Sequence, residues 1–154
     1  AILSYSSAFK MDVSLLRLFS VYGPNSPEHL VTTRLISQLL QGNMFRVGNL
    51  FPKRDFIYIQ DVVNAIKKII DKSYGSNIYN IGTGKSYSIL EICNILQKIS
   101  NKKMKIKSIK SQSRKSDVLD IFADISKIKK LGWKQQTSIV EGLRLTCDWY
   151  SSKT

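Results

Sequence analysis

Cysteine, histidine and acidic residues are scarce in this 154-residue sequence. The two cysteines, Cys93 and Cys147, cannot by themselves form a disulfide scaffold or a four-ligand zinc site, so we expect no metal centre and a reducing, cytoplasmic setting. No apolar run approaches the roughly 18 residues of a membrane span, and we find no basic start followed by an apolar stretch and a small-residue cleavage site, so no secretory signal is expected. Because 43% of the residues are hydrophobic, we expect a folded domain rather than a disordered tail, with no membrane partner.

The shortage of acids leaves a formal net charge of +13, with 24 Lys and Arg against 11 Asp and Glu. Residues 92–116 contain no acid and could bind nucleic acid or an anionic membrane. However, Met104 and Ile106 alternate with lysines, which predicts an exposed strand with one wet face, and no aromatic side chain is available for base stacking. A basic nucleic-acid-binding protein is therefore the less favoured alternative. The basic residues of this stretch are Lys98, Lys102, Lys103, Lys105, Lys107, Lys110, Arg114 and Lys115.

Short apolar segments alternate with amphipathic ones along the chain, which is typical of an α/β fold without internal repeats. Polar side chains mark the predicted helix starts: Ser26 before Pro27, Asp61, and the capping boxes that open at Ser88 and Ser138. We interpret Gly82–Gly84 as a tight turn at the end of the last sheet strand. Predicted strands cover 13–19, 45–47, 56–59, 77–81 and 103–110.

Four groups of motifs stand out together, although each alone is weak. They are Arg17–Pro24, Gly48–Asp61, Tyr79–Gly84, and Arg114–Asp117 followed by Ala123–Lys127 and Leu131–Trp133. In this order and spacing they closely resemble the C-terminal half of the NAD-dependent epimerase/dehydratase family, whose members are extended short-chain dehydrogenases/reductases acting on nucleotide sugars. The resemblance covers nearly the whole chain, from about Leu3 to Tyr150.

The resemblance implies an α/β fold that is the C-terminal part of a Rossmann-type fold, with the last sheet strands and a small α/β substrate-binding region. Residues 1–154 would form a single truncated unit, in which the end of the NAD(P)-binding domain is interleaved with the nucleotide-sugar-binding region. The N-terminal half, which binds most of the NAD or NADP, would be absent. The parent enzyme would be a homodimer.

The resemblance also implies ligand roles for two arginines and one acid. Arg54 matches the family arginine that contacts the substrate diphosphate, and Arg114 matches a second nucleotide-contacting arginine. Asp117 matches the acid that accepts hydrogen bonds from the ribose hydroxyls. Arginine suits this task because its planar, permanently charged fork binds phosphate oxygens in pairs. The structural alternative for Arg54 is an ion pair with Asp55.

Further matched positions precede Arg54 in the chain. Phe19 matches a residue beside the nicotinamide of the cofactor, and Ser20 stands where the family usually has a substrate-contacting Asn. The segment that ends in His29 and Leu30 resembles a Pro-Glu-Lys-Leu motif near the substrate phosphates, with His29 in place of the lysine. These matches predict that Ser20, His29 and Leu30 contact the nucleoside-diphosphate sugar and that Phe19 lies near NAD(P).

The catalytic groups of the family have no match in this sequence. The Tyr-x-x-x-Lys pair is missing, since Tyr5 and Lys10 are five positions apart, and no glycine-rich cofactor fingerprint is found. We therefore expect no catalytic residue and no turnover by this chain alone. The leading interpretation is the nucleotide-sugar-binding C-terminal portion of an NAD(P)-dependent epimerase or dehydratase. A non-catalytic nucleotide-sugar-binding remnant is the alternative, and the sugar and its nucleotide stay open.

Overall fold

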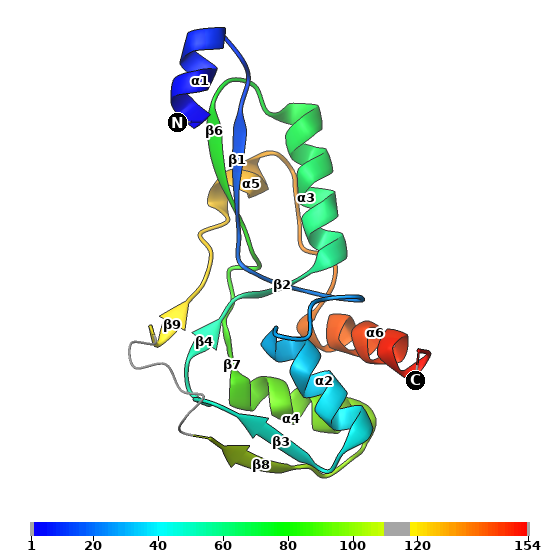
Figure 1. Cartoon of the computed structure of the whole chain (residues 1–154). Coiled ribbons are helices and arrows are strands. Elements are labelled where there is room, and N and C mark those ends of the chain that lie inside the picture. The colour runs from blue at the N-terminus through cyan, green and yellow to red at the C-terminus, as the bar shows by residue number, and fades with distance from the viewer. Residues whose placement is uncertain (1, 110–117, 154) are drawn as a thin grey trace.

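Pairs of short parallel strands form the framework of the fold (Figure 1). The computed structural model describes residues 2–109 and 118–153. In these ranges, β1 (Ser14–Leu18) pairs with β6 (Asn77–Ile81), β2 (Ser20–Tyr22) with β5 (Phe56–Tyr58), and β3 (Met44–Val47) with β8 (Lys105–Ser108). All three pairs are parallel, which confirms the predicted α/β class.

A fourth sheet carries Arg54. Its central strand is β4 (Lys53–Arg54), which pairs with β7 (Tyr87–Ser88) in antiparallel orientation and with β9 (Asp120–Ile121) in parallel orientation. Arg54 lies opposite Tyr87 on one side and Ile121 on the other. The backbone of Arg54 is therefore fixed by a strand on each side.

The helices gather at two ends of the molecule. Around β1 and β6 lie α3 and α5, with α1 beyond them, whereas α2, α4 and α6 lie at the opposite end near β3 and β8 (Figure 1). None of the helices in residues 2–109 and 118–153 combines the length and the apolar character that a bilayer crossing needs. The helices are α1 (Ile2–Phe9), α2 (Val31–Gln41), α3 (Ile59–Lys72), α4 (Ile89–Ser100), α5 (Ser126–Lys130) and α6 (Ile139–Ser151).

Two hydrophobic cores correspond to these two ends. One core is built on α3, β6 and the segment around α5, and includes Ile81, Ile128 and Trp133. The other is built on α2, α4 and α6 together with β3, and includes Phe45, Ile92 and Leu143. The chain alternates between the two cores. One end contains β1, α3, β6 and α5, and the other contains α2, β3, α4, β8 and α6.

The lysine-rich strand has the predicted two-sided character. Met104, just before β8, is buried, and Ile106 packs against the core of α2, α4 and α6. Lys105 and Lys107 are exposed on the other side of the strand. Lys105 and Lys107 are thus solvated side chains on the outer face of a structural strand.

The predicted start of α2 is wrong. The helix begins at Val31, and its N-cap is Leu30 rather than Ser26. Before it, the chain makes a turn in which the Leu30 N–H donates to the carbonyl of Pro27 at 3.1 Å. The Ser-Pro-Glu signal therefore marks a turn, and the helical hydrogen bonds begin later, with the Arg34 N–H donating to Leu30 O at 3.0 Å.

Asp61 is not the cap of α3, which is a second correction. The helix begins two residues earlier, at Ile59, and Asp61 occupies its first turn. The Asp61 carboxylate is fully buried and accepts the backbone N–H groups of Gln136 at 2.9 Å and Thr137 at 3.0 Å. Asp61 therefore joins α3 to the segment that leads into α6.

The other two predicted caps are confirmed. The Ser88 hydroxyl accepts the Glu91 N–H, while the Glu91 carboxylate accepts the Ser88 N–H at 2.8 Å, which is a complete capping box. Ser138 caps α6 by accepting the Glu141 N–H at 3.2 Å, which is the N-cap half of the capping box predicted there. These caps fix where α4 and α6 begin.

Candidate functional site

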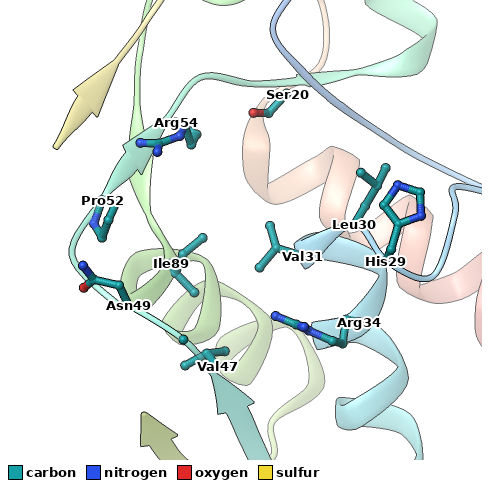
Figure 2. Close-up of a pocket in the computed structure, with 11 residues that line it drawn as sticks. Ser20, His29, Leu30, Val31, Arg34, Val47, Asn49, Pro52, Arg54 and Ile89 are labelled. Atoms are coloured by element: carbon teal, nitrogen blue, oxygen red, sulfur yellow. The ribbon is translucent and has the colours of Figure 1, made fainter. Parts of the chain in front are cut away.

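Three adjoining hollows share the side chains of Ser20 and Arg54. The first, which we call the main pocket, has a volume of about 420 Å³ (Figure 2). The other two, of about 620 Å³ and 340 Å³, both border Phe19 and are called the adjoining hollows. The main pocket is lined by Ser20, His29, Leu30, Val31, Arg34, Val47, Gly48, Asn49, Pro52, Arg54 and Ile89.

The structure brings together four of the residues selected from the sequence. Ser20, His29, Leu30 and Arg54 all line the main pocket, although they come from three separate segments of the chain. Phe19, the residue matched to the cofactor, lines only the adjoining hollows. Arg114 and Asp117 lie outside the described residues. The ligand roles of all seven stay predictions.

The guanidinium of Arg54 is held at the edge of the pocket by main-chain carbonyls. Its Nη1 donates to the carbonyl of Lys53 at 2.7 Å and to that of Val118 at 2.8 Å. The side chain is half-buried, and Figure 2 places it across the pocket from α2. A fixed, permanently charged group at the rim of a cavity is suited to an anionic ligand.

Asp55, the next residue, has a structural role. Its side chain is 1% exposed, and its carboxylate accepts the backbone N–H groups of Thr83 and Gly84, each at 2.8 Å, and of Ala123 at 3.1 Å. It also accepts the hydroxyl of Thr83 at 2.7 Å. This network satisfies the buried carboxylate oxygens of Asp55. Residues 82–84, predicted as a tight turn, bend the chain after β6, with Gly84 at a φ of +76°.

Backbone hydrogen bonds position Phe19 and Ser20. The Phe19 N–H donates to Ile81 O at 3.0 Å, and the Ser20 N–H donates to Asp55 O at 2.9 Å. The chain therefore changes partner between these two residues, from β6 to the strand that follows Arg54. As a result, Ser20 lies where the main pocket meets the adjoining hollows.

Arg34 is a pocket residue that the sequence analysis missed. It extends from α2 into the main pocket (Figure 2), and its Nε atom is buried. No group in the described part of the chain accepts the Nε proton. An unsatisfied buried donor costs about 1–3 kcal/mol. The available sequence signal is its position four residues after Leu30, which places both on one helix face.

Nucleophilic thiol chemistry is excluded at both cysteines. Burial raises the pKa of the Cys93 thiol to about 12 and that of Cys147 to about 11, so both thiols are protonated near neutral pH. Within the described ranges, no three His, Cys, Asp or Glu side chains gather into a group that could hold a metal ion.

Tyr5 is exposed on α1, and its ring stacks on that of Phe9 with 5.3 Å between the ring centroids. It lies at the other end of the molecule from α2 (Figure 1).

Comparison with known proteins agrees with the resemblance seen in the sequence. A family model described as GDP-mannose 4,6 dehydratase matches residues 1–146, and the chain belongs to this family of NAD-dependent epimerases and dehydratases acting on nucleotide sugars. A UDP-glucuronate 4-epimerase from Thermodesulfobacterium geofontis is 35% identical over 95% of this chain and 45% of that protein. An Arabidopsis thaliana trifunctional UDP-glucose 4,6-dehydratase/epimerase/reductase is 30% identical over 97% of this chain and 23% of that protein.

Solved structures place the chain in the same fold. The UDP-glucose 4-epimerase of Thermotoga maritima, determined with UDP-glucose, has a TM-score of 0.87 and 27% identity over 99% of this chain and 50% of that chain. The UDP-glucuronic acid 4-epimerase of Bacillus cereus, determined with UDP-glucuronic acid and NAD, has a TM-score of 0.88 and 28% identity over 98% and 49%, respectively. The chain thus matches half of the Rossmann-type fold and spans about half the length, or less, of these relatives.

Proposed function

We propose that this chain supplies the nucleotide-sugar-binding portion of an NAD(P)-dependent nucleotide-sugar epimerase or dehydratase. The observation that carries the proposal is that Ser20, His29, Leu30 and Arg54, selected at scattered positions of the sequence, line one pocket. Its volume of about 420 Å³ falls within the range of small-molecule sites.

The chemistry of the lining suits a sugar attached to a diphosphate. Arg54 provides a permanent positive charge for the diphosphate, and backbone N–H groups at the start of α2, beside His29 and Leu30, favour phosphate oxygens on the facing rim. Ser20 offers one donor and two acceptors to a sugar hydroxyl at the junction with the adjoining hollows. In this arrangement, the sugar points toward Phe19.

Phe19 is the one residue of this chain that we assign to the cofactor. It borders both adjoining hollows, the larger of which has a volume of about 620 Å³. The cofactor, NAD or NADP, supplies hydride transfer to and from the sugar when it is bound. Residues outside this chain would hold most of it, and the complete enzyme would be a homodimer.

The binding part of the proposal is tested by calorimetric titration with UDP-glucose and GDP-mannose. We expect binding of at least one of them, and we expect Arg54→Ala to weaken it about tenfold or more, because a charged hydrogen-bonding group is removed. Arg144→Ala, an exposed substitution on α6, is the matched control and should leave the affinity unchanged. Absence of binding at millimolar concentration would contradict the proposal.

The catalytic part is tested separately. Since the Tyr-x-x-x-Lys pair has no match, we expect no conversion of UDP-, GDP-, CDP- or dTDP-sugars when NAD or NADP is added. Turnover would show that this chain carries catalytic groups of its own. Binding without turnover is also what a non-catalytic nucleotide-sugar-binding protein would give, and Arg54 would have the same role in it.

A further inference from the structure

We propose that Arg34 selects the nucleobase of the nucleotide sugar, favouring bases that carry a carbonyl oxygen at the position where cytosine and adenine carry an exocyclic amino group. The inference rests on the proposed function, because it takes the main pocket as the site of a nucleoside diphosphate. It adds a residue and a selectivity that no sequence motif indicated.

The position of Arg34 in the pocket separates it from Arg54. Figure 2 shows the two arginine side chains on opposite sides of the cavity, one from α2 and one from β4, with Val31 and Ile89 between them. A diphosphate held by Arg54 therefore directs its nucleoside toward Arg34. A volume of about 420 Å³ leaves room for both parts of such a ligand.

The surroundings of Arg34 suit a flat ring better than a phosphate. Val31, Val47 and Ile89 line the same part of the pocket with apolar surface (Figure 2). Apolar walls with a few oriented polar groups are typical of sites that bind a heterocycle, because the walls contact the ring faces while the polar groups contact its edge. Asn49 is a further polar side chain on the lining.

The hydrogen-bonding character of Arg34 gives the selectivity its direction. A guanidinium has five N–H donors and no acceptor. The Arg34 side chain lines the pocket, and its terminal Nη groups, rather than the enclosed Nε, are the donors that a ligand can reach. A carbonyl oxygen of uracil, thymine or guanine would accept a proton from these Nη groups. The exocyclic amino group that cytosine or adenine carries instead would place a donor against a donor, which leaves a buried group unsatisfied.

The test compares matched nucleotides on matched variants. UDP and CDP differ at the edge of the base, where a carbonyl group of UDP is replaced by an amino group in CDP. GDP and ADP form a second pair, in which a carbonyl group of GDP is replaced by an amino group in ADP. Dissociation constants would be measured for the unmodified protein, Arg34→Met and Arg34→Lys, with Arg144→Gln as an exposed control. We expect UDP or GDP to bind at least tenfold more tightly than its amino-bearing counterpart, and the control to keep that ratio.

Arg34→Met should reduce the ratio of the two dissociation constants below threefold. It should weaken the binding of the carbonyl-bearing nucleotide and leave the binding of its counterpart almost unchanged. Arg34→Lys keeps the charge but removes the planar fork, so it should also lose most of the selectivity. Thermal unfolding shows whether each variant folds. If Arg34→Met does not fold, the comparison is made with Arg34→Lys instead.

Two results would overturn the inference. If Arg34→Met weakens all four nucleotides and inorganic pyrophosphate equally, Arg34 contacts the phosphates and the proposed function stands without this selectivity. If nucleotides bind but neither the ratio nor the affinity depends on Arg34, its role is structural. Failure of every nucleotide to bind would instead reject the proposed function itself.

Discussion

The carboxylate of Asp55 accepts the backbone N–H of Thr83 at 2.8 Å and thereby ties the strand that carries Arg54 to the turn that ends β6. Gly82 and the Asp55 carboxylate lie close together. A Cβ added at Gly82 would lie 2.6 Å from Asp55 Oδ2 and 2.6 Å from the Cβ of Ala123. The Gly-Thr-Gly turn is therefore required for packing against Asp55, whose carboxylate fixes the backbone next to Arg54.

Replacement of this carboxylate should destabilise the protein strongly. Asp55→Ala would leave the N–H groups of Thr83, Gly84 and Ala123 without their acceptor, and each unsatisfied buried donor costs about 1–3 kcal/mol. We expect a loss of about 3 kcal/mol or more in the free energy of unfolding, measured by urea denaturation. Asp71→Ala, at an exposed position of α3, should change it by less than about 0.5 kcal/mol. Similar values for the two variants would show that the network around Asp55 contributes little.

Much of the fold could be predicted because its elements carry local signals. The predicted strands 13–19, 45–47, 56–59 and 77–81 correspond to β1, β3, β5 and β6. The pairing of β4 with β7 and β9 was not predicted, because strands of two residues have no periodicity to detect. Local signals fail where a polar side chain has a distant partner.

Asp61 illustrates that failure. An acid at the start of an amphipathic segment indicates a cap, yet its carboxylate binds Gln136 and Thr137, which lie 75 and 76 positions away. Nothing in the local sequence distinguishes the two roles, since a carboxylate accepts backbone N–H groups in both. The contact depends on the packing of α3 against the segment before α6.

The candidate site was predictable only in part, for a related reason. Ser20, His29, Leu30 and Arg54 were selected through motif resemblance, and the structure places them around one cavity. Arg34 carries no motif, and an arginine within an amphipathic helix ordinarily indicates a solvent-facing position. Its half-buried position follows from the packing of α2 beside β3 and α4, which determines the shape of the pocket.

Both cysteines should resist thiol reagents while the protein is folded. Burial raises the pKa of Cys93 to about 12 and of Cys147 to about 11, and neither side chain is accessible. With Ellman's reagent at pH 8, we expect fewer than about 0.2 thiols per chain to react within minutes, and both to react in 6 M guanidinium chloride. Rapid reaction of one thiol in the native protein would mean that α4 or α6 opens locally.

The capping box of α4 should make stability depend on pH in the acid range. A hydrogen bond from the backbone N–H of Ser88, together with one from its hydroxyl, holds the pKa of Glu91 below its ordinary value of 4.5. The unfolded chain therefore binds this proton more tightly than the folded chain. The contribution of Glu91 to stability is complete above pH about 4.5 and is lost as the pH falls through the lower pKa of the folded state.

Glu91→Gln removes the titrating group, so the difference in stability between this variant and the unmodified protein should be largest at pH 6 and should shrink toward pH 3. Urea denaturation at several pH values measures this difference. Glu141→Gln, at the equivalent position of α6, is the matched comparison, because the Glu141 N–H also donates to the N-cap serine, Ser138, at 3.2 Å. A difference for Glu91→Gln that stays constant from pH 6 to pH 3 would mean that its carboxylate is not stabilised by the Ser88 hydrogen bonds in solution, and that α4 begins without the reciprocal half of its cap.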